Sequence, residues 1–198
     1  MIAKKENLYF KLILHLMCFV RFSLVLLFFL NGGLSIQAQD KWEIDKKASI
    51  EFSGKKAQGS LSGLTGNIVF SPDSLSSSYF NVEVDVATIE TGNSLKNKHA
   101  KNENWFFVDQ FPKISFRSEN IIRRQDRFIA AGVLEVRGVK REAQIIFDFE
   151  ENEQVGIFLG TMKVNRLDFG IEGNMMAFVV GEDFDVSIEV PVLKVSKK

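Results

Sequence analysis

Residues 184–190 read FDVSIEV, in which every second side chain is apolar and each intervening one is small or charged. Residues 80–86, FNVEVDV, repeat the alternation. Because successive side chains of a strand point to opposite faces of a sheet, a period of two is typical of half-buried antiparallel strands. Both stretches therefore predict strands with one apolar and one polar face.

Shorter runs with the same period extend over most of residues 41–190. They are centred on Ile50/Phe52, Ile68/Phe70, Ile114/Phe116, Leu134/Val136, Ile145/Phe147/Phe149 and Val155/Ile157/Leu159. Turn signals separate them, among them Gly54, residues 71–73 and Gly170. About eight strands at this spacing, without helical patterns between them, predict an antiparallel sandwich or barrel.

One stretch departs from this period. In residues 91–107, a candidate N-cap (Thr91 or Asn93) is followed by Leu95, His99 and Ala100 at helical spacing. We expect one short helix there.

The first 38 residues have the layout of a secretory signal: an early basic segment, an apolar run and a small residue at Ala38. Met17 is a second candidate start, because the residues after it form a complete signal. The alternative is an uncleaved membrane anchor. However, the uninterrupted apolar run after Arg21 covers only residues 22–30, whereas roughly 20 apolar residues are needed to span a bilayer. We therefore predict cleavage after Ala38, an exported protein in the periplasm or outside the cell, and one domain in residues 39–198.

Composition narrows the function classes. The whole chain has 25 basic and 25 acidic residues, and residues 39–198 have 21 and 24, a net charge of −3. A neutral or acidic chain is not the usual nucleic-acid binder. The single cysteine, Cys18, lies in the predicted leader, and no spacing of His, Cys or carboxylates suggests a metal site. We expect no nucleic acid, metal or cofactor.

Phenylalanine is unusually frequent, with 14 of the 19 Phe in residues 39–198, where Tyr79 is the only tyrosine. Phe has no hydrogen-bonding group, so it suits a dry interior. An eight-stranded barrel is either filled by its side chains or wide enough for one apolar ligand. The periodicity leaves both possibilities open.

Catalysis has little support. His99 is the only histidine after the leader, and no G-x-S-x-G elbow accompanies it, so a hydrolase would need a remote serine and acid. Arg166 has two interpretations: it contacts an anionic head group, or it pairs with Asp168 on one strand face before the turn at Gly170.

Several segments, in this order and spacing, carry a resemblance that covers about residues 41–190. They are residues 42–45, 49–52, 63–70, 88–93 with His99 and 105–109, 111–118, 132–141 and 165–171. Together they resemble the YceI-like family of lipid- or polyisoprenoid-binding proteins of bacterial envelopes. The chain departs from that family at residues 96–98, Lys-Asn-Lys, where an Arg-Asp pair is usual, and at Ala48, where His is frequent.

The resemblance implies an all-β fold, an extended lipocalin-like, eight-stranded antiparallel barrel with one short helix. It also implies non-catalytic binding, sequestration or transport of a long-chain amphiphile such as a polyisoprenoid, a polyprenyl phosphate or an isoprenoid quinone. The alternative is a filled barrel that acts as a structural or partner-binding protein, and a homodimer is left open. The predicted apolar lining is Phe52, Phe70, Phe80, Val82, Val84, Phe116, Leu134, Phe147, Phe149 and Ile188. The predicted rim or head-group residues are His99, Trp105 and Arg166.

Overall fold

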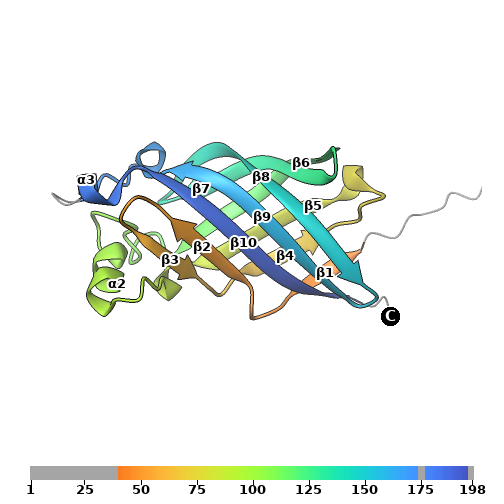
Figure 1. Cartoon of the computed structure of the whole chain (residues 1–198), viewed down its shortest axis with the longest axis horizontal. Helices are drawn as coiled ribbons and strands as arrows, with labels where there is room; N and C mark the ends of the chain where they lie inside the picture. Colours follow the sequence, from red (N-terminus) through yellow and green to blue (C-terminus); the bar gives the residue numbers. More distant parts are fainter. Residues whose placement is uncertain (1–39, 174–176, 196–198) are drawn as a thin grey trace, which may run out of the picture. The chain divides into compact units, whose positions relative to one another are not determined.

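The computed structural model describes residues 40–173 and 177–195, which form an antiparallel β-barrel (Figure 1). The predicted leader, residues 1–38, lies outside the described residues. The strands are β1 (Lys41–Ile44), β2 (Ser49–Ser53), β3 (Gln58–Leu61), β4 (Thr65–Val69), β5 (Tyr79–Asp85), β6 (Lys113–Arg124), β7 (Arg127–Val136), β8 (Val139–Asn152), β9 (Val155–Asn165) and β10 (Asp183–Lys194). The helical segments are α2 (Ser94–Lys101), α3 (Ala177–Val180) and the 3-10 turns η1 (Leu75–Ser77), η2 (Val86–Thr88) and η3 (Arg166–Phe169). Within this part of the chain, no helix is long and apolar enough to cross a membrane.

The sheet closes on itself. Its strands follow the order β1-β4-β5-β6-β7-β8-β9-β10, and β10 pairs again with β1. One edge of β10 is shared, because its residues 185–189 pair with β2 and its residues 192–194 with β1. β1 and β2 therefore share one strand position, and β4 and β3, which pair with β1 and β2 respectively, share the next. The barrel therefore has eight strand positions, and the predicted eight-stranded antiparallel barrel with a short helix is confirmed.

A side-chain turn separates β1 from β2. The carboxylate of Asp45 accepts a hydrogen bond from the Lys47 N–H at 2.8 Å, and its carbonyl accepts one from the Ala48 N–H at 3.0 Å. Such a turn offers the backbone a local alternative to the sheet ladder. The strand is thereby interrupted, and it resumes along β10.

The alternation in the sequence becomes an inside and an outside. In β7, every second residue from Phe128 to Val136 is buried, while the residues between them are partly exposed. Charged side chains of β10 such as Asp185 and Glu189 are exposed, whereas Val190 is buried. Closure leaves few unpaired edges, so the apolar faces meet inside without exposing backbone groups there.

Aromatic rings fill one end of this interior. Phe70, with an exposed fraction of 0%, is the centre of the group. Its ring lies 5.1–6.1 Å from five others, those of Phe80, Phe128, Phe147, Phe149 and Phe158. The indole N–H of Trp42 donates to the Phe70 carbonyl at 2.9 Å, and the Trp42 ring lies edge-on to Phe149 at 5.1 Å. We call these seven residues the aromatic cluster.

Close packing in the aromatic cluster requires a glycine. A Cβ on Gly156 would lie 2.8 Å from the Phe149 ring and 3.2 Å from the Trp42 ring. Both distances are shorter than ordinary contacts, so no larger residue fits between the two rings without moving them. Each pair of rings packed at these angles contributes about 0.5–1.5 kcal/mol beyond the burial of its surface.

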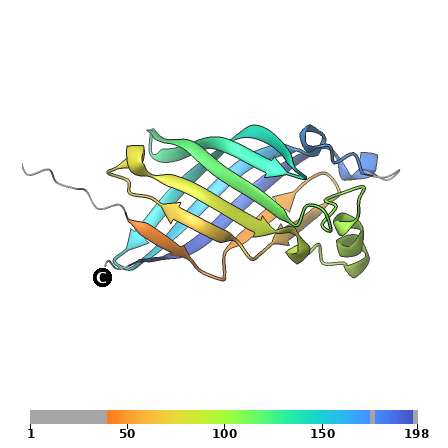
Figure 2. The same cartoon turned by 180° about the vertical axis from the view of Figure 1, so that it is seen from behind.

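The short helix α2 lies at the opposite end, near the β2–β3 hairpin (Figures 1 and 2). The side chain of Asn93 caps its N-terminus by accepting from the Lys96 N–H at 3.0 Å. The helix ends at Lys101, because the Phe106 N–H donates back to the Ala100 carbonyl at 3.0 Å. Within the predicted stretch 91–107, Trp105 and Phe106 therefore belong to the turn that follows the helix.

Candidate functional site

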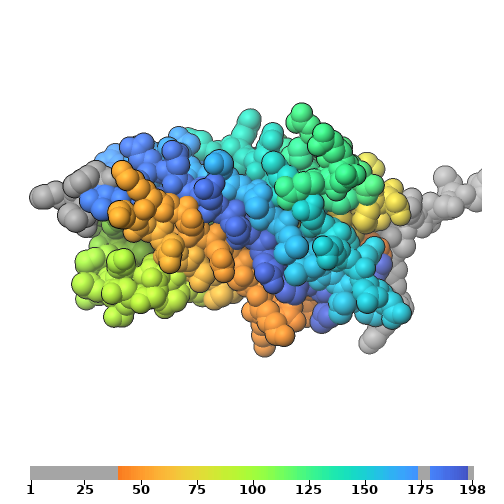
Figure 3. Space-filling view, in the orientation of Figure 1, coloured from red at the N-terminus to blue at the C-terminus, as the bar shows by residue number. Residues whose placement is uncertain are grey.

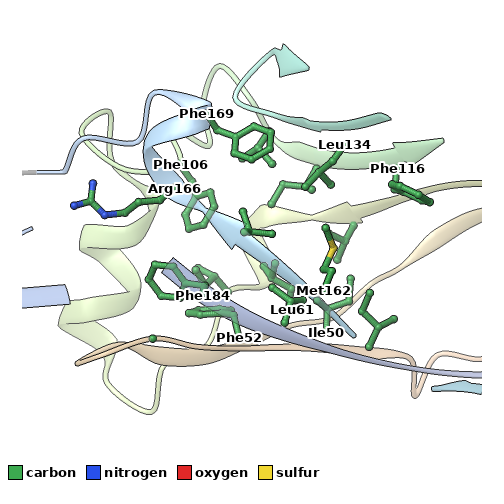
Figure 4. Close-up of a pocket in the computed structure, with 18 of the residues that line it drawn as sticks. Ile50, Phe52, Leu61, Phe106, Phe116, Leu134, Met162, Arg166, Phe169 and Phe184 are labelled. Atoms are coloured by element: carbon green, nitrogen blue, oxygen red, sulfur yellow. The ribbon is translucent and has the colours of Figure 1, made fainter. Parts of the chain in front are cut away.

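A cavity of about 760 Å³ occupies the barrel between the aromatic cluster and α2 (Figure 4). Its walls are apolar side chains from β2–β10, together with the segments that follow α2 and β9. Phe80, Phe147 and Phe158 belong to both the cavity and the aromatic cluster, so they form its floor. The barrel is thus filled at one end and hollow toward the other.

Most of the predicted lining residues lie on this cavity. Those that do are Phe52, Phe80, Val82, Val84, Phe116, Leu134, Phe147 and Ile188. They come together because each occupies the inward-facing position of its strand, and the closed sheet turns all those positions toward one space.

Phe70 and Phe149 do not line it. Both point into the barrel, as the alternation indicates, but they lie in the aromatic cluster beyond the cavity floor. Their rings are 5.1 Å apart, and Phe149 stacks on Phe158 at 4.4 Å. The expected position of these two residues is therefore corrected: periodicity gives the face of a side chain, not its depth along the barrel.

Other lining residues were not on the predicted list. They include Ile50, Leu61, Phe106, Met162, Phe169 and Phe184. The period of two was sufficient to find Ile50 and Phe184, which share faces with Phe52 and Ile188. Phe106 and Phe169 lie in irregular segments whose direction depends on the tertiary fold, so no local pattern indicates them.

Basic side chains surround the mouth of the cavity. Lys55 and Lys56 stand at the tip of the β2–β3 hairpin, and Lys96 and His99 on α2, all at the cavity's edge. In the space-filling view, the β2–β3 hairpin and α2 lie side by side at this end (Figure 3). The acidic lining residue, Glu83, has its carboxylate 3.5 Å from the ammonium of Lys113. The mouth therefore presents an excess of positive charge.

Arg166 lies deeper than these lysines, with an exposed fraction of 7%. Its guanidinium donates to the carbonyls of Gly181 at 2.7 Å and Glu172 at 2.8 Å, and also to the Ile171 carbonyl. Figure 4 shows the guanidinium at the α2 end of the lining residues. A buried cation held by carbonyl oxygens is thus fixed in place at the cavity mouth.

The local sequence explains how Arg166 is positioned. The side chain of Asn165 accepts from the Leu167 N–H at 2.9 Å and starts the turn η3, which Gly170 ends with a φ of 66°. Arg166 and Asp168 therefore lie in a 3-10 turn and not on one face of a strand, contrary to one of the two interpretations. Arg166 contacts backbone carbonyls instead.

The two remaining rim residues differ in depth. Trp105 is partly buried, and its ring lies 5.8 Å from the Arg166 guanidinium carbon. His99 is exposed on α2. All three predicted rim residues thus lie at the same end of the cavity, from three different segments of the chain.

Residues 42–192 match the family model described as the YceI-like domain. The chain belongs to the YceI-like family. The resemblance drawn from the sequence segments is therefore confirmed. Among curated relatives are UPF0312 proteins of Photorhabdus laumondii, 21% identical over 120 residues, and of Yersinia enterocolitica, 24% identical over 119 residues. These alignments cover 57% and 56% of this chain and only 62% and 61% of the relatives.

Three solved structures share the fold. BcnA of Burkholderia cenocepacia has a TM-score of 0.68 at 17% identity, over 77% of this chain and all of that one. The YCEI protein of Campylobacter jejuni has a TM-score of 0.63 at 18% identity, over 73% and 87% of the two chains. A polyisoprenoid binding domain from Saccharophagus degradans, described as implicated in plant cell wall breakdown, has a TM-score of 0.60 at 11% identity, over 78% and 98%. At these identities the likeness shows the fold alone.

This YceI-like protein holds α2 against the barrel through a polar network. The Asn97 side chain donates to the Glu90 carboxylate at 2.9 Å and accepts from the Thr91 hydroxyl at 2.7 Å. The Gly92 N–H donates to the same carboxylate at 2.6 Å. These bonds, first that of Asn97 and then that of Gly92, hold the pKa of Glu90 below its ordinary value. Asn97 lies in residues 96–98, the segment in which the family usually carries an Arg-Asp pair. In this chain Asn97 thus has a local structural role.

The described residues contain no group of three or more His, Cys, Asp and Glu side chains placed to hold a metal ion. Chemically, the site offers an apolar volume, a basic mouth and one buried guanidinium.

Proposed function

We propose that this protein binds a long-chain isoprenoid amphiphile, without catalysis, with the tail in the cavity and the head group at the basic mouth. The observation that carries the proposal is the apolar cavity of about 760 Å³, filled in by aromatic rings at one end and edged by lysines at the other. That volume lies within the range of about 300–1,000 Å³ typical of small-molecule sites.

The energetics favour a tail of several isoprene units. Burying one five-carbon unit gains roughly 4 kcal/mol gross, at about 0.8 kcal/mol for each carbon group. A few units therefore offset an association cost of about 4–15 kcal/mol. In a filled barrel, the alternative, side chains would occupy the whole interior. Here the aromatic cluster occupies only one end.

Charge at the mouth favours an anionic head group, and hence a polyprenyl phosphate over a quinone. Lys55, Lys56 and Lys96 have no ion-pair partner within the described part of the chain, so their ammonium groups are available to an anion. Arg166 and Trp105 lie just inside them. A phosphate on an isoprenoid tail matches both parts of the site.

Native mass spectrometry of the full chain, purified from the envelope of its own source cells and followed by organic extraction, tests the proposal. We expect a bound mass that extracts as an isoprenoid lipid. Titration with a matched pair, a polyprenyl phosphate and the polyprenol of the same length, then tests the head group, and we expect tighter binding of the phosphate. A protein that carries no lipid and takes up neither compound would contradict the proposal.

Export is part of the same proposal, because isoprenoid lipids are membrane components that an envelope protein meets. N-terminal sequencing of the purified protein is expected to start at Gln39. Intact residues 1–38 would contradict cleavage, but would leave lipid binding untouched.

A further inference from the structure

The barrel wall has an unpaired region between β8 and β9. These two strands pair from Ile146 and Thr161 to the turn that joins them. Beyond that point, β8 remains paired with β7 as far as Val139, and β9 with β10 as far as Asn165. Among the described residues, 139–145 of β8 and 162–165 of β9 therefore have no strand partner on the edges that face each other.

A second hollow of about 620 Å³ lies at this gap. Its polar lining residues are of mixed charge: Glu119, Arg141, Glu142, Gln144, Lys163, Asn165 and Asp168. Four apolar residues, Leu134, Met162, Val164 and Phe169, line both this hollow and the main cavity. The two spaces are thus separated by side chains and not by a ladder of backbone hydrogen bonds.

Arg141 supports an opening in the wall at this point. By alternation along β8 it shares the inward-facing positions of Ala143, Ile145 and Phe147, and it pairs with Leu134, which is buried. A charge at such a position in a closed wall would be desolvated, at considerable cost. Arg141 is nevertheless exposed, and its guanidinium donates to the Lys140 carbonyl at 3.0 Å. The Arg141 side chain is therefore in contact with water, although its position on β8 faces inward.

Phe169 fills the boundary between the two spaces. It has an exposed fraction of 4% and comes from η3, which packs against β8 across the gap. Figure 4 shows its ring on the same side of the cavity as Leu134. Arg166 holds the start of η3, and the glycine at position 170 ends it, so the Phe169 ring can move without breaking a sheet ladder.

We propose that the gap between β8 and β9 is a side entrance to the cavity, through which the apolar tail of a long-chain amphiphile enters and leaves past Phe169. The inference rests on the proposed function. The mixed polar rim keeps the outer end of the gap hydrated, and the shared apolar residues give the tail a continuous dry path inward. The mouth at α2 then holds the head group of the bound molecule.

Site-specific blocking of the gap tests this route. In the full chain with Cys18→Ser, Gln144→Cys places a single thiol on the outer face of β8 beside the gap. Glu150→Cys places the matched control on the same face of the same strand, where β8 is paired with β9. Each thiol is coupled to a maleimide polyethylene glycol. Uptake and release of cis-parinaric acid, a long-chain anion that fluoresces in apolar surroundings, are followed by stopped flow.

We expect the polymer at position 144 to slow uptake and release about equally, by roughly tenfold or more, with an unchanged Kd, and the polymer at position 150 to change neither rate. Phe169→Leu, a conservative variant that keeps the boundary apolar, is expected to speed both rates. Unchanged rates at position 144, with slower exchange when the polymer is placed on Lys96→Cys at the mouth, would overturn the side entrance and leave the proposed function standing. Failure of the unlabelled protein to bind cis-parinaric acid, a polyprenyl phosphate and the matching polyprenol would overturn both.

Discussion

The two ends of the barrel are made from the same alternating strands and are both rich in phenylalanine, yet they differ in packing. At one end Phe70 is fully buried and touches five other rings. At the other, Phe52 and Phe184 are only partly buried, and their centroids are 6.1 Å apart at the edge of the cavity. Phenylalanine therefore stabilises the fold where other side chains surround its ring, and it can contact a ligand where part of its ring faces empty space.

Irregular segments create the hollow end. The β2–β3 hairpin, α2 and η3 stand where a filled barrel would need further inward side chains. They contribute Lys55, Lys56, Lys96 and Arg166 to the cavity. The aromatic cluster therefore anchors the fold, whereas the α2 end supplies the properties that a ligand recognises.

The largest expected effect separates the two ends by stability. Phe70→Ala removes the central ring of a close-packed cluster, so we expect a loss of about 3–5 kcal/mol in the free energy of unfolding. Phe184→Ala enlarges a space that is already hollow and should cost clearly less. Urea unfolding of both variants measures the difference, and equal losses would show that the two ends are packed alike.

The next largest effect is expected on ligand binding at the hollow end. Val186→Trp fills the cavity from an inward-facing position of β10, so we expect at least a roughly tenfold weaker affinity for a polyprenyl phosphate, or about 1.4 kcal/mol. Ser187→Trp, one residue further and exposed on the outer face, is the matched control and should bind as the unmodified protein does. Equal affinities of the two variants, both folded by circular dichroism, would remove the cavity from the binding site.

A smaller effect concerns charge at the mouth. Lys56→Glu should weaken binding of a polyprenyl phosphate a few-fold at low salt, and less at high salt because exposed charges are screened. The neutral polyprenol should be unaffected. Arg124→Glu, an equal charge reversal on the β6 end of the β6–β7 hairpin, serves as control. If both reversals act alike, net charge and not the mouth is responsible.

The smallest expected effect is a pH dependence at α2. The pKa of Glu90 is lowered in the folded state, so its bonds to Asn97 and Gly92 stabilise the fold above the ordinary pKa of 4.5 and are lost as the pH falls through the lower folded value. In an NMR titration, the Asn97 side-chain amide and the Gly92 N–H should shift with a midpoint below pH 4.5. Glu90→Gln should abolish this transition, and a midpoint at or above 4.5 would contradict the network.

Local sequence was sufficient for the class of fold and for the faces of the strands. Alternation in residues 80–86 and 184–190 indicated half-buried strands, and the closed barrel keeps those faces. It also placed Asn93 correctly as a candidate cap of the helix. Periodicity succeeds there because it depends only on backbone geometry, which repeats along each strand.

The depth of each inward side chain, and the irregular segments that reach the cavity, depend on the three-dimensional fold. Phe70 and Phe80 look alike in sequence and both belong to the aromatic cluster, but closure of the sheet places only Phe80 on the cavity floor. Arg166 and Phe169 reach the cavity because η3 leaves the ladder and packs across β8. Depth and enclosure arise from contacts between segments distant in the chain, which no short-range pattern encodes.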